Sequence, residues 1–425
     1  MGLSLLMFIR YRMPRNSEAL RVSSSIDRRR FLKATGASAV AATLAGCTSG
    51  GNGGDGGGDS GGDGGDSGDS DGDSGDSGDS DDGGSGELTS VSFATPPVGM
   101  PVNIVIEYYL AENNLIQPRF EEDGYQLDYE LTFEDATLFA SGQIDMGTVS
   151  WVEDARLGVE QDQQLVTFGN IEGVVTGSFV KAGGPYDPEN TGSVQATLDK
   201  VVEDEARYGI PGWAAGSVPH FQNILQEVYG YTLAQDGGDF NVQTTERGTM
   251  PELVMRGDLA VGTHSASSAG LTEVSNGDLK PIIWPWNEYL EQGWGRPPLV
   301  SLSTRLDFAE ENPEVLLNMI NMWSEGLNYV QENISEIAAD PAGQETLEAE
   351  NEEEAQFLLD LFSGNDVSPV QGLTESALYS EVGLDEQSVE EAQNLLGVME
   401  DLGQIPSGWE DQLTFMTVSD LEDMV

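Results

Sequence analysis

The sequence has 425 residues, and its 18 Lys and Arg stand against 74 Asp and Glu, which gives a formal net charge of −56 at pH 7. A field of this sign repels phosphate backbones, so nucleic acid is excluded as a partner. Acidic residues also lie within segments of clear apolar periodicity, which argues against disorder of the whole chain. The simplest interpretation is a halophilic, haloarchaeal protein whose surface repulsion is screened by concentrated salt.

The first 46 residues have the layout of an export signal. The run RRRFLK over 28–33 is a twin-arginine pattern, and the apolar stretch over 34–45 is too short to span a bilayer of ~30 Å. The sequence LAGC that ends at Cys47 resembles a lipoprotein cleavage box, in which this cysteine becomes the lipidated first residue of the mature chain. The alternative is an apolar stretch with a chance cysteine. We expect export by the twin-arginine pathway and a lipid anchor at the extracellular face of the cell membrane.

Cys47 is the only cysteine in the sequence, so an exported form has no internal disulfide to rely on. Residues 48–86 consist almost entirely of Gly, Ser and Asp, with eleven aspartates and no base. Such a composition cannot bury a core. Residues 47–86 are therefore predicted to be a lipidated cysteine followed by a disordered tether.

From Glu87 onward, the apolar period alternates between strand-like and helix-like. The expected strands are 88–95, 125–132, 144–149, 165–168, 175–180, 207–210, 240–245, 259–263, 282–284 and 299–302. The expected helices are 102–115, 134–141, one that begins at Trp151, 217–229, 250–256, 313–331, 345–362 and 388–402. Alternating strands and helices predict an α/β fold with mostly parallel sheets flanked by helices, with ligand clefts at the carboxyl ends of the strands.

Two segments share one pattern. LFASGQIDMGTVSW over Leu138–Trp151 and LVMRGDLAVGTHSA over Leu253–Ala266 each have a helix end, a glycine turn, an aspartate before a strand, and Gly-Thr near the end of that strand. Two equivalent loops in two lobes indicate a cleft that closes from both sides. The alternative is simple strand–helix repetition without a shared function.

The order of these motifs over 89–420 resembles the type II periplasmic solute-binding proteins of the nitrate, sulfonate and taurine uptake group, including the branch that binds thiamine pyrimidine precursors. The resemblance rests on VSFATPPVGMP, ASGQID, YGIPGWAAGSVPHFQNIL, RGDLAVGTH and EDLGQIP. It implies a two-lobed type II periplasmic-binding-protein fold, with lobe I over 87–180 and 301–425 and lobe II over 181–300. The crossovers are expected near 181–190 and 301–306. Four tryptophans depart from the family pattern and leave the ligand open, namely Trp213, Trp284, Trp286 and Trp294.

The resemblance also implies that loops after the strands line the cleft. The expected ligand-binding residues are Val98, Gly99, Met100, Phe133, Glu134, Asp135, Ser150, Trp151, Trp213, Ser217, His220, His264 and Ser265. Backbone N–H groups at the helix starts near Asp135, Ser150 and Ser217 can donate to an anionic or carbonyl group. Glu134 and Asp135 argue against a bare anion unless their side chains point away.

Several of these residues have a second interpretation. His220 and His264, the only histidines, are either ligand contacts or polar residues at element ends. No metal-ligand spacing surrounds them, so neither a metal nor a cofactor is expected. Trp151 and Trp213 are either a stacking pair around a flat ring or a cationic amine, or core packing.

The segment Ile282–Pro298, IIWPWNEYLEQGWGRPP, is rich in tryptophan and is expected to form a flap or hinge near the second crossover. Arg296 is its only base. It can meet an acidic group of the ligand, or it can satisfy a neighbouring Asp or Glu.

These observations predict a monomeric, membrane-anchored solute-binding component of an ABC importer. It would capture a small organic ligand by hinge closure and deliver it to permease and ATPase subunits. A ligand similar to a sulfonate, taurine, nitrate, a pyrimidine or a betaine-like amine remains open, and the tryptophans favour a flat or cationic molecule. An enzyme is not expected, because no nucleophile-elbow pattern is present and the related pyrimidine synthases carry a cysteine-rich iron motif that this chain lacks. The alternatives are a ligand-sensing partner of a membrane receptor and, less favoured, a thiamine-pyrimidine-synthesis-like enzyme.

Overall fold

The computed structural model describes residues 88–96, 101–132, 134–213, 215–265 and 270–425, except for the side chain of Ser265. All of them belong to one compact unit, Asp82–Val425. The predicted signal, the lipidated Cys47 and the tether lie outside the described residues, as do the predicted site residues Val98, Gly99, Met100 and Phe133. Within the described part, no helix is both long enough and apolar enough to cross a bilayer.

Lobe I is built on a six-stranded sheet. Its strands are β1 (Thr89–Thr95), β2 (Tyr125–Leu131), β3 (Met146–Val149), β4 (Leu165–Gly173), β10 (Pro298–Arg305) and β11 (Leu413–Phe415), in the order β11-β4-β10-β3-β1-β2. β1 is parallel to both β2 and β3, and β11 is parallel to β4. β10 is antiparallel to both of its neighbours.

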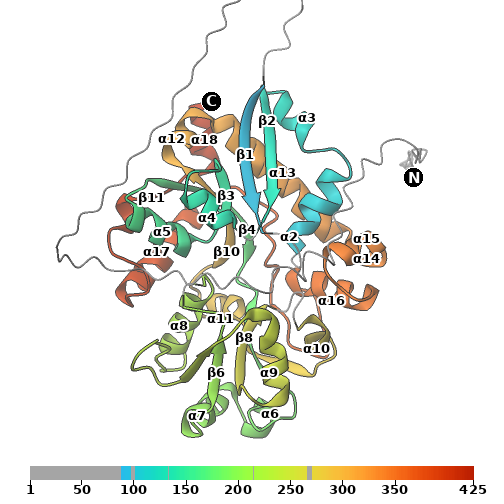
Figure 1. Ribbon diagram of the computed structural model, residues 1–425, viewed down its shortest axis with the longest axis vertical. Helices are drawn as coiled ribbons and strands as arrows, with labels where there is room; N and C mark the ends of the chain where they lie inside the picture. The colour runs from blue at the N-terminus through green and yellow to red at the C-terminus, as the bar shows by residue number, and fades with distance from the viewer. Residues whose placement is uncertain (1–87, 97–100, 133, 214, 266–269) are drawn as a thin grey trace, which may run out of the picture. The chain divides into compact units, whose positions relative to one another are not determined.

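Lobe II is built on a five-stranded sheet (Figure 1). Its strands are β5 (Thr176–Lys181), β6 (Arg207–Ile210), β7 (Asn241–Thr244), β8 (Val261–Ser265) and β9 (Leu279–Ile283), in the order β7-β6-β8-β5-β9. β6 is parallel to β7 and β8, whereas β5 is antiparallel to β8 and β9. The two sheets share one arrangement: the strands β2-β1-β3-β10-β4 of lobe I correspond to β7-β6-β8-β5-β9 of lobe II. The strand that is antiparallel to its neighbours is β10 in lobe I and β5 in lobe II. The predicted two-lobed α/β fold with mostly parallel sheets is confirmed.

Helices cover both faces of the lobe I sheet because successive side chains of a strand point to opposite faces. Two neighbouring residues of β1 show this. The Phe93 ring lies edge-on to Trp323 of the helix 313–332, whereas Ala94 belongs to the hydrophobic cluster that contains Trp151 of the helix 151–161. The helical elements of lobe I are α2 (Pro101–Asn103) and its π-helical continuation η1 (Ile104–Ala111), α3 (Gln117–Glu121), α4 (Asp135–Ala140), α5 (Trp151–Gln161), α12 (Leu306–Glu311), α13 (Pro313–Glu332), α14 (Ile334–Ala339), α15 (Pro341–Thr346), α16 (Glu352–Phe362), α17 (Glu386–Asp401), η3 (Trp409–Asp411) and α18 (Val418–Met424).

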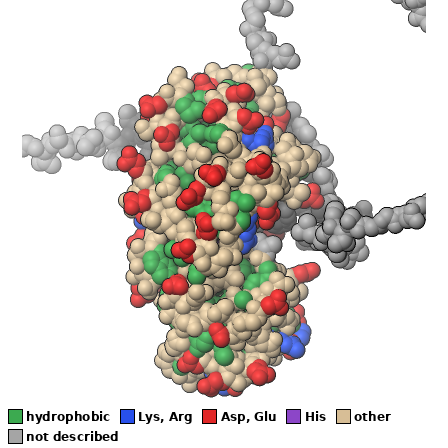
Figure 2. All heavy atoms as spheres, turned by 90° about the vertical axis from the view of Figure 1, so that its left-hand side faces the viewer, with side chains coloured by type: hydrophobic (Ala, Val, Ile, Leu, Met, Phe, Trp, Pro, Cys, Tyr) green, Lys and Arg blue, Asp and Glu red, His purple; other side chains and the backbone are tan. Residues whose placement is uncertain are grey.

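The helices of lobe II surround the smaller sheet. They are α6 (Pro188–Thr191), α7 (Val194–Glu203), α8 (Val218–Glu227), η2 (Arg247–Thr249), α9 (Met250–Arg256), α10 (Leu271–Ser275) and α11 (Pro285–Gln292). Figure 2 shows Asp and Glu side chains scattered over the visible face of the protein, with few Lys or Arg among them, as the composition predicts.

The shared sequence pattern occupies equivalent places in the two lobes. Gly142 follows α4 with a φ of +71°, and Gly257 follows α9 with a φ of +80°. Both backbones lie in the left-handed region that favours glycine. The first turn leads into β3 and the second into β8, which occupy equivalent places in the two sheets. A Cβ on Gly262 of β8 would stand 2.7 Å from the Val254 side chain, so this strand glycine lets α9 pack closely.

The passages between the two sheets differ from the expected crossovers. The segment 175–180 was assigned to lobe I, but it corresponds to β5, which pairs with β8 and β9 in the lobe II sheet. The chain therefore first changes sheets at 174–175, and it returns between β9 and β10, at 284–297. The expected positions near 181–190 and 301–306 are therefore wrong. Each passage leads into an interior antiparallel strand, β5 or β10, and the residue pattern of such a strand does not reveal to which of the two sheets it belongs.

Two tryptophans pack at these passages. A Cβ on Gly173, the last residue of β4, would stand 2.2 Å from the Trp286 ring, and one on Gly177 would stand 2.8 Å from the Trp284 ring. The segment expected to form a flap or hinge, 282–298, contains the return passage between the sheets, as a hinge would, but it is not a flap: much of it is the helix α11, whose Trp286 is fully buried.

The other expected helices match the structure to within two residues at each end, except that the one expected over 102–115 ends at Ala111 and the one expected over 345–362 is broken. Several helices were not expected, among them α7 and α14. The expected helix 345–362 is interrupted, since α15 ends at Thr346 and α16 begins at Glu352. Asn351 accounts for the restart, because its side chain accepts a hydrogen bond from Glu354 N and caps the new helix.

Candidate functional site

The carboxyl ends of β1 and β3 form the switch point of the lobe I sheet, where successive connections leave in opposite directions. Thr95 ends β1, and Thr148 lies one residue before the end of β3. Thr148 Oγ1 lies 2.9 Å from Thr95 Oγ1 and 3.4 Å from Asp135 Oδ2. All three side chains are buried. We call Thr95, Asp135 and Thr148 the switch-point cluster.

Asp135 is the acidic member of this cluster and the first residue of α4. Its side chain is only 6% exposed, and burial raises its pKa to about 6, with the nearby Glu153 carboxylate adding to the rise. Glu134, the preceding residue, is exposed, and its backbone N–H donates to Thr132 Oγ1. The structure therefore places one of the two predicted acids, Asp135, inside the switch-point cluster.

The N-terminal end of α5 lies next along the chain. Ser150 and Glu153 form a reciprocal capping box, in which Glu153 N donates to Ser150 Oγ while Glu153 Oε2 accepts from Ser150 N at 2.9 Å and from Ser150 Oγ at 2.7 Å. Ser150 is a predicted site residue, but Glu153 was missed. The spacing Ser-x-x-Glu at 150–153 was the signal that could have identified it.

The N-terminal end of α8 in lobe II meets this capping box. A Cβ built on Gly216 would stand 2.9 Å from Ser150 Oγ and 3.3 Å from the Glu153 carboxyl group. The next residue, Ser217, is 1% exposed, and its Oγ has no hydrogen-bond partner among the described residues. The starts of two helices from different lobes thus face one another beside the switch-point cluster.

Lobe II carries its own cluster of buried hydroxyl groups, which joins β5, β6 and β8. Ser178 Oγ lies 2.7 Å from Tyr208 Oη and 3.3 Å from Thr263 Oγ1. His264 follows Thr263, is buried, and stacks on Phe179 with the ring centroids 4.3 Å apart. Its predicted contact with the ligand stays a prediction, as does that of Ser265.

His220 is the third residue of α8, and its side chain is buried inside lobe II. Its Nδ1 is 3.4 Å from Tyr289 Oη, and its ring meets the Tyr289 ring edge-on. Burial lowers its pKa to about 3, so the imidazole is neutral at physiological pH. The structure favours the interpretation of His220 as a core residue between α8 and α11.

Trp151 and Trp213 occupy different environments. Trp151 is 3% exposed, its Nε1 donates to Asn170 Oδ1 at 3.1 Å, and its ring lies edge-on to Phe415. Trp213 follows β6 and is half-buried against the lobe II core. Core contacts hold the Trp151 ring, but Trp151 also lines a cavity that it shares with Arg296, so its contact with the ligand stays a prediction. Trp213 lies just beyond the end of β6.

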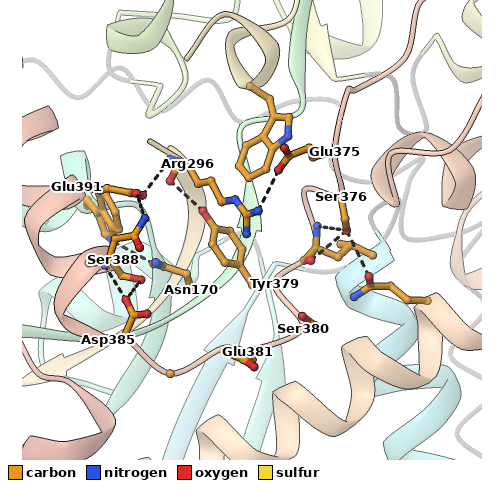
Figure 3. Close-up of a pocket in the computed structure, with 16 residues that line it drawn as sticks. Asn170, Arg296, Glu375, Ser376, Tyr379, Ser380, Glu381, Asp385, Ser388 and Glu391 are labelled. Atoms are coloured by element: carbon orange, nitrogen blue, oxygen red, sulfur yellow. Dashed lines mark hydrogen bonds and ion pairs between the residues drawn. The ribbon is translucent and has the colours of Figure 1, made fainter. Parts of the chain in front are cut away.

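A cavity of about 560 Å³ lies beside the passages between the sheets (Figure 3). Arg296 is one of the residues that line it. One of its guanidinium nitrogens pairs with Glu375 at 2.9 Å, its backbone N–H donates to Glu391, and its backbone carbonyl accepts from Tyr379 Oη. Of the two interpretations of Arg296, the structure favours the one in which it satisfies neighbouring carboxylates. The cavity joins residues of α17 and the 375–388 segment to residues of the second passage.

Two buried acids near this region were not predicted. Asp154 Oδ2 accepts hydrogen bonds from Thr167 and Ser303, and burial raises the pKa of Asp154 to about 7. Glu172 is fully buried, neither carboxyl oxygen has a partner among the described residues, and desolvation raises its pKa well above the ordinary value. No group of three or more metal-ligating side chains is placed to hold a metal ion in the described part of the chain.

The geometry can be compared with solved structures. The fold is similar to the periplasmic aliphatic sulphonate binding protein SsuA from Escherichia coli, with 11% identity, 76% of this chain and 90% of that chain covered, and a TM-score of 0.53. It is similar to the alkanesulfonate-binding protein SsuA from Xanthomonas axonopodis pv. citri, with 10% identity, coverage of 78% and 100%, and a TM-score of 0.54. The periplasmic nitrate-binding protein NrtA from Synechocystis PCC 6803 has 12% identity, coverage of 79% and 88%, and a TM-score of 0.52.

No protein-family model and no curated protein sequence matches the chain. At identities of 10 to 12%, the similarity to the solved structures shows the fold alone. The class that the fold defines is the two-lobed type II periplasmic-binding-protein fold, in which each lobe is a mostly parallel sheet flanked by helices.

Proposed function

We propose that this protein is the membrane-anchored, extracellular solute-binding component of an ABC importer, and that it holds a small organic molecule between the switch points of its two lobes. The observation that carries the proposal is the meeting of the α5 and α8 starts, where Gly216 lies against Ser150 beside the buried switch-point cluster. Ligands of open α/β sheets bind at such switch points. The fold similarity to sulfonate- and nitrate-binding proteins supports the same role.

Solute capture of this kind requires no chemistry on the ligand. A ligand that contacts both lobes binds the closed arrangement more tightly than an open one, and it therefore raises the population of the closed form. The backbone at 174–175 and 284–297 joins the two sheets, so changes of dihedral angle there rotate one lobe against the other.

Anchoring follows from the sequence. Lipid on Cys47 would hold the chain at the membrane. A Cys47→Ala variant is expected to release the protein into the medium, as measured by immunoblotting of cells and culture supernatant. Retention of that variant in the membrane fraction would contradict the anchor.

Native mass spectrometry tests the binding role. The full chain, extracted from its own membranes in concentrated salt, is expected to retain one small organic compound, and Trp213→Ala is expected to retain less of it. Deletion of the gene should then abolish cellular uptake of that compound. If no compound is retained and no solute in a broad panel raises the Tm, the binding role is wrong. If the compound binds but its uptake is unchanged, the sensing alternative gains support.

A further inference from the structure

The start of α5 is the place where a type II cleft could offer backbone N–H groups to an anion, since helix N-termini attract negative charge. In this chain that position is already occupied. The Glu153 carboxylate accepts from Ser150 N and Ser150 Oγ, so a carboxylate of the protein itself covers the helix end. An anionic ligand arriving there would meet a like charge instead of free donors.

The second acid lies on the same side of the sheet. Asp135 is buried in the switch-point cluster, and the residue that follows it, Ala136, lines one hollow together with Glu153. Thr148 Oγ1 lies 3.4 Å from Asp135 Oδ2, which is a long distance for a hydrogen bond. Across the lobes, Ser217 contributes a buried hydroxyl without a partner among the described residues. This unused polar group beside Gly216 indicates that the contact between the lobes is completed by something outside the chain.

Among the described residues, no Lys or Arg forms an ion pair with Asp135 or Glu153. The strand-end loops 96–100, 132–135, 150–151, 211–217 and 264–270 contain no Lys or Arg. Arg156 shares α5 with Glu153 and attracts its carboxylate, but the hydrogen bonds of its guanidinium go to the Gln404 carbonyl, at 2.8 Å for Nη2. Arg247 follows β7, the edge strand one step away from the lobe II switch point, and it is exposed.

We infer that the ligand of the switch-point site is an organic cation that presents N–H donors to Asp135 and Glu153, rather than a free oxyanion or a sulfonate. This inference rests on the proposed function and names the substrate class for it. Carboxylates are acceptors only, so a protonated amine or amidine satisfies both of them at once, and the Ser217 hydroxyl can accept a further N–H. The solute class then differs from the sulfonate and nitrate named for the structural neighbours.

The charge of the retained compound provides the first test. The compound extracted from the full chain is identified by mass spectrometry, and its affinity is measured by calorimetry for the wild type, Glu153→Gln, Asp135→Asn and the control Glu160→Gln. Glutamine also serves in a capping box, so Glu153→Gln is expected to keep the α5 start intact and to leave the Tm within a few degrees. Glu160 lies on the same helix, exposed and away from its start.

We expect a cationic compound whose affinity falls at least tenfold in Glu153→Gln and in Asp135→Asn and stays within twofold in Glu160→Gln. An anionic compound, or equal affinity in all four proteins, overturns the inference and leaves the solute-binding role standing. If no compound is retained, ethylammonium, ethanesulfonate and nitrate are titrated against the full chain. Binding of ethylammonium alone supports the inference, whereas binding of either anion, or of none of the three, overturns it; the broad Tm panel then decides separately whether the solute-binding role stands.

Discussion

Gly216 of lobe II lies directly against Ser150 of lobe I, and a Cβ at Gly216 would stand 2.9 Å from Ser150 Oγ. Side-chain carbons essentially never approach this closely, and Ser150 Oγ is held in the capping box with Glu153, so it cannot move aside freely. The absence of a side chain at residue 216 is therefore what lets the two helix starts meet.

Gly216→Ala is expected to weaken ligand binding at least tenfold while changing the Tm little, because the added methyl group obstructs contact between the lobes rather than packing within one. Calorimetry with the retained compound measures the affinity. Gly248→Ala is the matched control in the same lobe, since nothing lies within 4 Å of a Cβ there. Unchanged affinity in Gly216→Ala would show that the contact plays no part in closure.

The packing of Trp286 on Gly173 provides a test of stability. A Cβ on Gly173 would stand 2.2 Å from the fully buried indole, so Gly173→Ala is expected to lower the free energy of unfolding by about 2–3 kcal/mol and the Tm by several degrees. Gly397→Ala on α17, where a Cβ meets nothing within 4 Å, should instead stabilise by about 0.5–1 kcal/mol. A Gly173→Ala protein as stable as the wild type would contradict this packing.

Asp154 makes stability depend on pH. Its pKa is raised from 3.8 to about 7 in the folded protein, so the native state binds more protons than the unfolded state between these values. Stability that is present below pH ~4 is then lost as the pH rises to ~7, by up to about 4 kcal/mol. Asp154→Asn is expected to flatten this part of the curve of unfolding free energy against pH, whereas Glu160→Gln on the same helix should not. Parallel curves for Asp154→Asn and the wild type would refute the assignment.

Arg296 is expected to contribute little to binding or stability. Its pair with Glu375 is about half exposed on both sides, and such pairs contribute about 0–1 kcal/mol. Arg296→Gln should therefore keep ligand affinity within twofold and lower the Tm by no more than a few degrees, as measured by calorimetry and thermal unfolding. A large loss of affinity would instead place an acidic group of the ligand at Arg296.

Much of the fold could be predicted because it follows from local periodicity. The strand 207–210 and the helix 250–256 match β6 and α9 residue for residue, and the long helix at 313–331 matches α13 within one residue. The repeated glycine turns at Gly142 and Gly257 were also recognisable, since both require a backbone that other residues rarely adopt.

The candidate site could be predicted only in part. Asp135 and Ser150 lie at the ends of recognisable elements, and the structure brings both to the switch point. His220 has the same kind of position in the sequence, yet burial and its contact with Tyr289 hold it in the core, whereas Trp151 and its partner Asn170 line a cavity. A residue type near a strand end does not reveal the direction of its side chain, because packing against distant elements decides it.

The amino-acid order was sufficient for the class of fold, the acidic surface and the expectation of a lipid anchor, since each depends on composition, spacing or period within a short stretch. The meeting of Gly216 with Ser150, the Glu153 carboxylate over the start of α5, and the place of β5 in the second sheet depended on the tertiary structure. These features join residues far apart in the chain, and the free energy of such contacts is shared among many partners that no local pattern records.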